Sequence, residues 1–176
     1  LLERFIPPPS PAQRRRSIER AMREAASHGV TSVQIMSNGN ASVDYSIIAT
    51  LAELLGEGKL TVRVYVAPAI AAVDDQARLG TGRAFGGPML RIGALKAYAD
   101  GSLGSRTAYF FEPFDDQPGN RGLLSEDMQP LAKMREWMLR GDAAGLQLCT
   151  HAIGDAGIAT ILDLYQQIEN AHGQRD

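Results

Sequence analysis

Hydrophobic positions along the chain recur with two periods, one typical of helices and one typical of strands. Ser10-Pro11-Ala12-Gln13 has the form of a capping box with proline at the first helical position, and apolar residues follow at helical spacing up to Gly29. Shorter runs rich in β-branched residues fit strands. The pattern predicts a helix between Ser10 and Gly29, strands at Val30–Met36, Leu60–Ala67, Leu90–Asp100 and Leu146–His151, and helices at Asp44–Leu55, between Ser125 and Gly145, and from Asp155 onward.

Two stretches follow neither period. Ala69–Gly87 is rich in alanine and glycine and predicts a short helix followed by a loop, whereas Gly101–Leu124 has only loop character. A loop of that length inside a compact domain is usually functional or mobile. For the last helix, the spacing predicts one apolar side made of Ile158, Ile161, Leu162, Tyr165 and Ile168.

The alternation of strands and helices predicts an α/β fold with parallel strands and helical crossovers. Two architectures meet this description, an open doubly wound sheet and part of a (β/α)8 barrel, and in both the chemistry gathers at the carboxyl ends of the strands. Four strands cannot close an eight-stranded barrel, so the barrel interpretation requires that about half of it lies outside these 176 residues. The chain also opens on Leu1-Leu2 without an initiator methionine, and we expect it to be a piece of a longer protein.

Composition excludes several classes of function. The net charge of −2 argues against nucleic acid as the main partner, because phosphate binding needs a concentrated basic surface. No apolar run reaches membrane-spanning length, and no signal peptide is recognisable. Cys149 is the only cysteine, so an intrachain disulfide is excluded and a cytoplasmic location is favoured.

His151 and Lys96 are the side chains best suited to chemistry. Because side chains alternate across a strand, Gln147, Cys149 and His151 share a polar face, which leaves the apolar face of that strand for helices. A histidine at the end of such a strand can ligate zinc or a similar metal, or can simply hydrogen-bond a neighbouring loop. Lys96 shares its face with Asp100, whose Cα is expected about 13 Å away at the mouth of the barrel.

An inward-facing lysine is costly to bury as a bare cation, and three arrangements relieve that cost. Lys96 could pair with a carboxylate, form a Schiff base with a carbonyl substrate, or be carbamylated into a metal-binding carboxylate. Asp100, and Ser102 and Arg106 in the loop that follows, are weaker candidates for substrate binding. Arg106 could hold a substrate oxygen or could tie the loop to an acidic neighbour such as Asp100.

Three segments together carry a family resemblance. The stretch LKAYADGSLGSRTA at Leu95–Ala108, AAGLQLCTHAIGD at Ala143–Asp155, and GVTSVQ at Gly29–Gln34 occur in order, with a proline- and glycine-rich pattern within Pro113–Leu124. In these segments, and along essentially its whole length, the chain resembles amidohydrolase family 3, the YtcJ-like branch of the amidohydrolase superfamily. The resemblance implies a (β/α)8 barrel that binds one or two divalent metals, zinc being the expected ion, and that hydrolyses amide-type C–N bonds of small molecules.

The resemblance also assigns roles to individual residues. His151 matches the metal ligand of the fifth barrel strand, and Lys96 matches the lysine of the fourth strand, which is carbamylated and bridges two metals in related proteins. The HxH pair of the first strand, the histidine of the sixth and the aspartate of the eighth have no counterpart here. We therefore expect residues 1–176 to form a single partial catalytic barrel domain, covering about strands two to five and lacking the first and last strands.

Three functional hypotheses follow from these observations. The first is a fragment of a metal-dependent amidohydrolase, which uses hydroxide activated by the metal and is inactive as an isolated chain. The second is a lyase or aldolase that forms a Schiff base on Lys96. The third is a non-enzymatic half-barrel whose open strand edges pair in a homo-oligomer.

Overall fold

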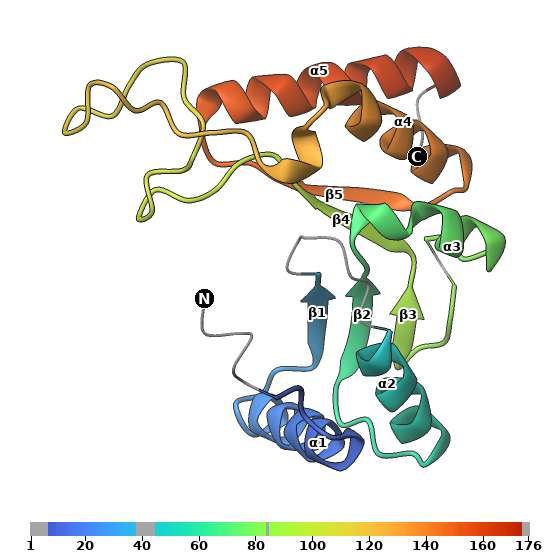
Figure 1. Ribbon diagram of the computed structural model, residues 1–176. Helices are drawn as coiled ribbons and strands as arrows, with labels where there is room; N and C mark the ends of the chain where they lie inside the picture. The colour runs from blue at the N-terminus through green and yellow to red at the C-terminus, as the bar shows by residue number, and fades with distance from the viewer. Residues whose placement is uncertain (1–6, 38–44, 84, 174–176) are drawn as a thin grey trace. The chain divides into compact units, whose positions relative to one another are not determined.

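The computed structural model describes residues 7–37, 45–83 and 85–173, in which helices and strands alternate (Figure 1). The helices are α1 (Pro11–Ser27), α2 (Ser46–Gly56), η2 (Ile70–Ala72), α3 (Val73–Arg78), η3 (Glu126–Met128), α4 (Leu131–Ala143) and α5 (Asp155–His172), of which η2 and η3 are 3-10 helices. The strands are β1 (Ser32–Met36), β2 (Arg63–Ala67), β3 (Leu90–Ile92), β4 (Ala94–Tyr98) and β5 (Gln147–His151). They form one sheet in the order β1-β2-β3 and a parallel pair, β4–β5. A mixed α/β fold with parallel strands is therefore confirmed.

The described residues fall into two compact units. The first unit is drawn from residues 1–35, 44–66 and 86–91, and the second from residues 36–43, 67–85 and 92–176. The first unit holds α1, α2 and most of the three-stranded sheet. The second holds β4, β5 and the remaining helices, and it contains all the candidate site residues.

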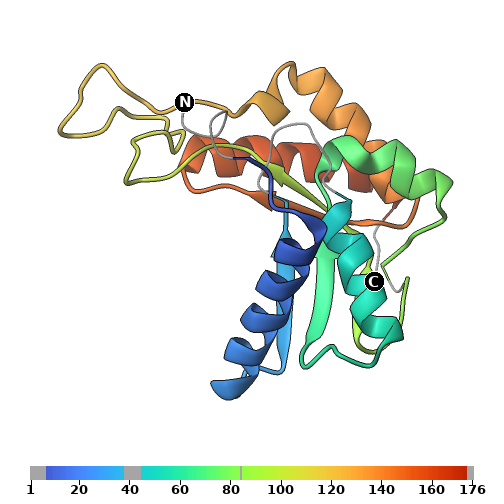
Figure 2. The same cartoon turned by 60° about the horizontal axis from the view of Figure 1, so that its bottom comes forward.

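In the first unit, α1 begins as the sequence predicts. The Ser10 hydroxyl accepts a hydrogen bond from the Gln13 amide at 3.3 Å, and the Gln13 side chain accepts one from the Ser10 amide at 2.8 Å, which completes the capping box. Both helices of this unit lie on the same side of the sheet (Figure 2). Met22 of α1 and Leu51 and Leu54 of α2 are buried, so each helix turns an apolar stripe inward.

The predicted strand at Leu90–Asp100 is wrong in one respect, because it is divided into β3 and β4, which belong to different sheets. The division falls at Gly93. A Cβ at this position would lie 2.7 Å from the Cα of Arg83 and 2.8 Å from its carbonyl carbon, so the chain at residues 82–83 approaches too closely for any side chain. The sign of this crossing in the sequence is Gly93 itself, because a glycine inside a strand often marks a close approach of backbone.

In the second unit, α4 and α5 cover one face of the β4–β5 pair (Figure 1). The hydrophobic core lies between them, and the strands contribute Leu95, Ala97 and Ala99 to it, with Leu146 from just before β5. Leu148 of β5 packs against the same core. The predicted apolar and polar faces of the two strands are therefore confirmed.

Three details of the helices of this unit differ from the prediction. Ser125 precedes η3 and does not cap an α-helix: its hydroxyl donates to the carbonyl of Tyr98, and α4 begins only at Leu131. The N-cap of α5 is Gly154, with Asp155 as its first residue. On α5, the buried residues include Ile161, Leu164 and Ile168, whereas Ile158 and Leu162 are 41% and 60% exposed. The apolar stripe is thus rotated from its predicted position.

Two further stretches bear on the prediction. Residues 69–87 hold η2 and α3 followed by an irregular segment, as expected from the sequence. Asp44, where the second helix was predicted to begin, lies outside the described residues. Among the described helices, none has both the length and the apolar character that crossing a membrane requires.

Candidate active site

The parallel register of β4 and β5 brings Lys96 and His151 onto one face of the second unit. Lys96 is the cross-strand partner of Cys149, and Tyr98 is the partner of His151. Lys96 and His151 are therefore diagonal neighbours, a relation that puts Cα atoms roughly 7–8 Å apart. Because partners in register share a face, the four side chains form a polar strip on the side of the strands opposite the helices.

Lys96 is half-buried, and its ammonium group lies over an aromatic ring. The Nζ atom is 4.4 Å from the centre of the Tyr98 ring, within the range of a cation–π contact. Burial lowers the pKa of Lys96, and this effect outweighs the opposing influence of Cys149 and Asp127, which raise it. Within the described part of the chain, no carboxylate oxygen lies within 4.0 Å of Nζ, so the plain ion pair is not formed there.

His151 is held through its Nε2 atom. Nε2 lies 2.8 Å from the carbonyl oxygen of Gly101, and because a carbonyl can only accept, Nε2 carries the proton. In the neutral imidazole, the Nδ1 atom then keeps the lone pair. The ring also packs against Tyr98, with ring centroids 5.4 Å apart, and the side chain is 30% exposed. The geometry thus leaves one nitrogen of a partly exposed imidazole able to act as a ligand or a base.

Asp100 follows the carboxyl end of β4, where the sequence predicts it, but its carboxylate is buried. Its side chain is 0% exposed. The carboxylate accepts hydrogen bonds from the backbone amides of Tyr109, Ile153 and Gly154, and its Oδ1 lies 3.7 Å from Nε2 of His151. The structure therefore shows Asp100 as a buried carboxylate whose oxygens are bonded to backbone amides.

Ser102 and Arg106 lie on the exposed loop that begins at Gly101. The Ser102 hydroxyl is 2.8 Å from that of Ser105, and the Ser102 amide donates to the hydroxyl of Thr107 at 3.1 Å. Arg106 has a positive φ of 53°. Its guanidinium forms a bidentate ion pair with Asp116, in which Nε lies 3.2 Å from Oδ1. The acidic neighbour of Arg106 is therefore Asp116 of the same loop, not Asp100. Both candidates are tied to loop residues on the surface.

Asp127 belongs to this region although the sequence did not single it out. It lies in η3, and its carboxylate accepts a hydrogen bond from the Tyr98 amide at 3.1 Å. Burial raises the pKa of Asp127, and the charges of Lys133 and Lys96 act in the opposite direction. An acidic residue just ahead of a helix reads as an ordinary first-turn residue, so no sequence signal distinguished it.

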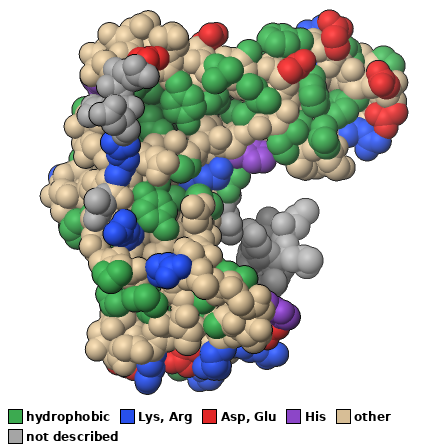
Figure 3. Space-filling model, turned by 180° about the vertical axis from the view of Figure 1, so that it is seen from behind, with side chains coloured by type: hydrophobic (Ala, Val, Ile, Leu, Met, Phe, Trp, Pro, Cys, Tyr) green, Lys and Arg blue, Asp and Glu red, His purple; other side chains and the backbone are tan. Residues whose placement is uncertain are grey.

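Exposed apolar residues gather on the second unit, outside this strip. The loop at 101–124 carries Leu103, Phe111 and Leu123, each more than half exposed, and α5 adds Leu162. Figure 3 shows hydrophobic side chains on the surface of this part of the molecule.

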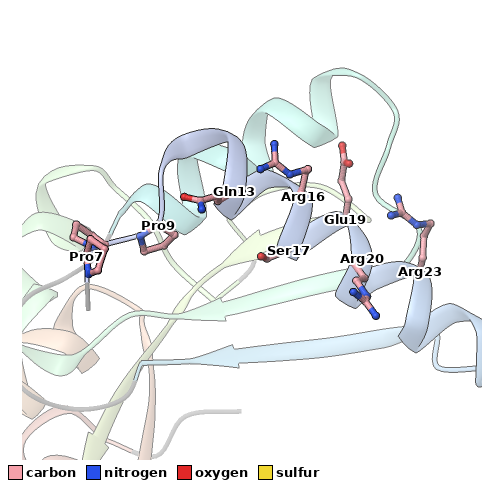
Figure 4. A pocket seen from close by; sticks show the side chains of 9 residues that line it. Pro7, Pro9, Gln13, Arg16, Ser17, Glu19, Arg20 and Arg23 are labelled. Carbon is pink, nitrogen blue, oxygen red and sulfur yellow. The ribbon is translucent and has the colours of Figure 1, made fainter. Parts of the chain in front are cut away.

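A hollow of about 850 Å³ lies elsewhere, along α1 in the first unit. Its lining includes Arg16, Arg20 and Arg23 together with Pro7 and Pro9. Figure 4 shows that Arg20 points away from Arg16 and Arg23, so the three guanidinium groups do not converge on one anion. We give this hollow no catalytic role.

The polar strip does not make a complete metal centre. Among the residues described by the structure, no group of three or more histidine, cysteine, aspartate or glutamate side chains could hold a metal ion together. His151 and Lys96 therefore offer at most part of a coordination sphere.

Comparisons with known proteins agree with the motifs. A model of the amidohydrolase family matches residues 1–176. YtcJ of Bacillus subtilis (strain 168), a protein assigned to the amidohydrolases, is 30% identical over 119 residues, which are 68% of this chain and 21% of YtcJ. Protein LONG AFTER FAR-RED 3 of Arabidopsis thaliana is 45% identical over 87 residues, which are 49% of this chain and 14% of that protein.

Two solved structures have the same fold over most of the chain. Both are uncharacterized metal-dependent hydrolases, one from Pyrococcus horikoshii OT3 and one from Pyrococcus furiosus. They match with a TM-score of 0.78 each and with 30% and 33% sequence identity, over 90% and 92% of this chain. The chain spans 31% and 32% of the length of these two proteins.

Proposed function

Because the chain belongs to the amidohydrolase family, we propose that it forms part of the barrel and of the metal site of a metal-dependent hydrolase. The single observation that carries this proposal is the β4–β5 register, which sets Lys96 and His151 side by side on the face opposite the helices. The whole enzyme acts on amide-type C–N bonds of small molecules. The two matched structures, themselves metal-dependent hydrolases, support the metal dependence.

Neighbour relations in the second unit support a partial (β/α)8 barrel. Just after β1, the Ser37 amide donates to the carbonyl of Ala67 at 3.0 Å. Just after β2, the carbonyl of Pro68 accepts from the Lys96 amide at 2.7 Å, and Lys96 in turn lies beside Cys149. Within this unit, the segments that follow β1 and β2, then β4, then β5 thus lie next to one another in chain order, as strands do around a barrel. We propose that residues 1–176 form one part of a single barrel domain.

His151 and Lys96 fit a divalent metal such as zinc. The Nδ1 atom of His151 keeps its lone pair because Nε2 donates to Gly101, and a neutral imidazole is a common zinc ligand. The lowered pKa of Lys96 favours the neutral amine, the form that adds to carbon dioxide to give a carbamate and releases a proton. The carbamate would then present carboxylate oxygens to the metal.

When bound, the metal supplies Lewis acidity, which polarises a carbonyl group and makes a water molecule more acidic. The chain's own residues hold and orient the ligands. Tyr98 packs against both Lys96 and His151, and Gly101 fixes the tautomer of His151. The loop from Ser102 to Arg106 borders this region and would shape the entrance for a substrate. Since the described residues hold no complete ligand cluster, we expect the isolated chain to bind metal weakly and to have no turnover.

Metal content and hydrolysis test this proposal. In the whole protein, His151→Ala is expected to lose bound zinc, measured by mass spectrometry of metals, together with amide hydrolysis. His172→Ala is the matched control, because His172 lies at the end of α5 and pairs with Asp142 at 2.6 Å; it should keep both. Tight, stoichiometric zinc with turnover in the isolated chain, or retained metal in His151→Ala, would contradict the proposal.

The lowered pKa of Lys96 also favours a second function, a lyase that forms a Schiff base with a carbonyl substrate. Borohydride reduction in the presence of small aldehydes and ketones tests it, since a trapped adduct on Lys96 adds a defined mass to one peptide. Absence of an adduct, together with carbamylated Lys96 in the whole protein, would leave only the hydrolase.

A further inference from the structure

Among the described residues of the second unit, Asp100 has the most completely enclosed acidic side chain. Its Oδ2 accepts from the amides of Gly154 at 2.7 Å, Tyr109 at 2.9 Å and Ile153 at 3.3 Å, and its Oδ1 accepts from the Ile153 amide at 3.0 Å. In the described part of the chain, no lysine or arginine pairs with it. All hydrogen bonds to this buried carboxylate thus come from backbone amides, an arrangement that is costly unless every bond is made.

The three amides come from two segments far apart in the sequence. Tyr109 belongs to the loop after β4, and Ile153 and Gly154 belong to the connection between β5 and α5. The loop after β4 is also joined to the first turn of α5, where the Tyr109 carbonyl accepts from the Gly157 amide at 3.1 Å. Asp100 thus ties both segments to the carboxyl end of β4.

The packing around this carboxylate is tight. A Cβ at Gly157 would lie 2.9 Å from Oδ2 of Asp100, and a Cβ at Gly154 would lie 2.5 Å from the Tyr109 nitrogen. Both glycines are needed for close approach, since neither has a positive φ. The sequence HAIGDAG therefore encodes a surface shaped to fit Asp100.

His151 is held near Asp100 from two sides, through Gly101 and through Ile153. Asp100 is followed directly by Gly101, whose carbonyl accepts from Nε2 of His151, and Ile153, two residues after His151, donates to Asp100. The carboxylate itself is 3.7 Å from Nε2, so its negative charge also favours a proton on that nitrogen.

We infer that Asp100 is a positioning residue, which holds Gly101 and the β5–α5 connection so that His151 stays in its Nε2–H form and presents Nδ1 outward. The use of Nδ1 for a metal rests on the proposed function, whereas the tautomer does not. Asp100 acts through its neighbours and touches no substrate.

The tautomer can be measured directly on the chain labelled with ¹⁵N-histidine, by two-bond ¹H–¹⁵N spectra at pH 8.5. His151→Ala identifies the signals. In the unmodified chain, His151 is expected as Nε2–H, and the amides of Tyr109, Ile153 and Gly154 should exchange slowly with solvent although they lie outside strands. An Nδ1–H form in the unmodified chain overturns the inference.

Asp100→Asn replaces an acceptor by a group that must also donate, and it removes the charge. The tautomer ratio of His151 should shift roughly tenfold toward Nδ1–H, the scale of one hydrogen bond to a charged group. Asp163→Asn, on the exposed side of α5, is the matched control and should leave the ratio unchanged. If exchange of the three amides accelerates in Asp100→Asn while the tautomer ratio stays fixed, Asp100 only ties the loops and the inference is wrong.

Gly157→Ala provides a second route if Asp100→Asn does not fold, because it displaces the carboxylate without changing its charge. The same direction of tautomer shift is expected, and an unchanged ratio would count against the inference. Zinc binding in the whole protein separates the two proposals. An Nε2–H histidine with no His151-dependent metal would contradict the proposed function and leave the role of Asp100 intact.

Discussion

Gly154→Ala is expected to destabilise the second unit strongly, although glycine here has an ordinary backbone conformation, with φ −70° and ψ 145°. The reason is that there is no room for a Cβ atom at this position. A Cβ at this position would lie 2.5 Å from the backbone nitrogen of Tyr109 and nearer still to its carbonyl group. Real Cβ atoms do not approach backbone atoms so closely, so one of the two segments must move.

Neither segment can move without losing hydrogen bonds. The Tyr109 amide donates to Asp100, the Tyr109 carbonyl accepts from Gly157, and the Gly154 amide donates to Asp100. Overpacking costs about 1–3 kcal/mol, and breaking one hydrogen bond to a charged group adds about 1.5–3 kcal/mol. We therefore expect a loss of about 3 kcal/mol in the free energy of unfolding.

Urea unfolding followed by the fluorescence of Trp137 measures this loss. Trp137 is the only tryptophan and packs against the core of the second unit, so it reports on the unit that carries Gly154. With a slope of about 2 kcal/mol per molar urea, a loss of about 3 kcal/mol lowers the midpoint by about 1.5 M.

Gly104→Ala is the control, because a Cβ at Gly104 would meet nothing within 4 Å. Its midpoint should stay close to that of the unmodified chain. Equal midpoints for Gly154→Ala and Gly104→Ala would refute the reasoning, since they would mean that the Tyr109 segment yields without cost.

Three other substitutions or titrations have equally definite outcomes. Leu95→Ala should lower the free energy of unfolding by about 2–5 kcal/mol, because Leu95 is fully buried, whereas Leu103→Ala, at a 58% exposed position, should change it by less than about 0.5 kcal/mol; urea unfolding compares them, and similar losses would contradict the core described above. Hydrogen bonding to Arg15 lowers the pKa of Glu57 to about 2, so the stabilisation from this pair is complete above the ordinary pKa of 4.5 and is lost as pH falls through about 2. Carboxyl NMR should find this midpoint and should find it raised toward 4.5 in Arg15→Met; an unchanged midpoint in that variant would exclude the pair as the cause. Burial lowers the pKa of Lys96, so an amine-directed acylating reagent should begin to modify Lys96 at a lower pH than exposed lysines, as read by peptide mass spectrometry; the reverse order would contradict a lowered pKa for Lys96.

The parts of this molecule that follow from local patterns were predictable from the sequence. The capping box at Ser10 satisfies helix-terminal amides with neighbouring side chains, so four consecutive residues suffice to locate the start of α1. The polar face of β5 follows from the two-residue period, which put Cys149 and His151 on the side away from the helices.

The parts that depend on distant segments were not predictable. The break at Gly93 arises where residues 82–83 cross it; a glycine inside a strand can indicate such an approach but does not identify the segment that makes it. Asp100 sits in a two-residue period that predicts an outward carboxylate, yet three amides from other segments enclose it. Arg106 has its acidic partner ten residues away, at Asp116, within a loop that has no period. In each case the structure depends on a contact with a residue too distant in the sequence for a hydrophobic or polar periodicity to predict it.

Gly93 also contributes to the β4–β5 register on which the candidate site depends. Its carbonyl accepts from the Gln147 amide at 2.9 Å, immediately before Ala94 pairs with Gln147. Counting on from this bond puts Lys96 beside Cys149, with His151 two positions further. A shift of the β4–β5 register by one residue would turn His151 or Lys96 toward the helices, so the polar side chains would no longer share one face. The glycine that divides the predicted strand is therefore also the one that aligns Lys96 with His151.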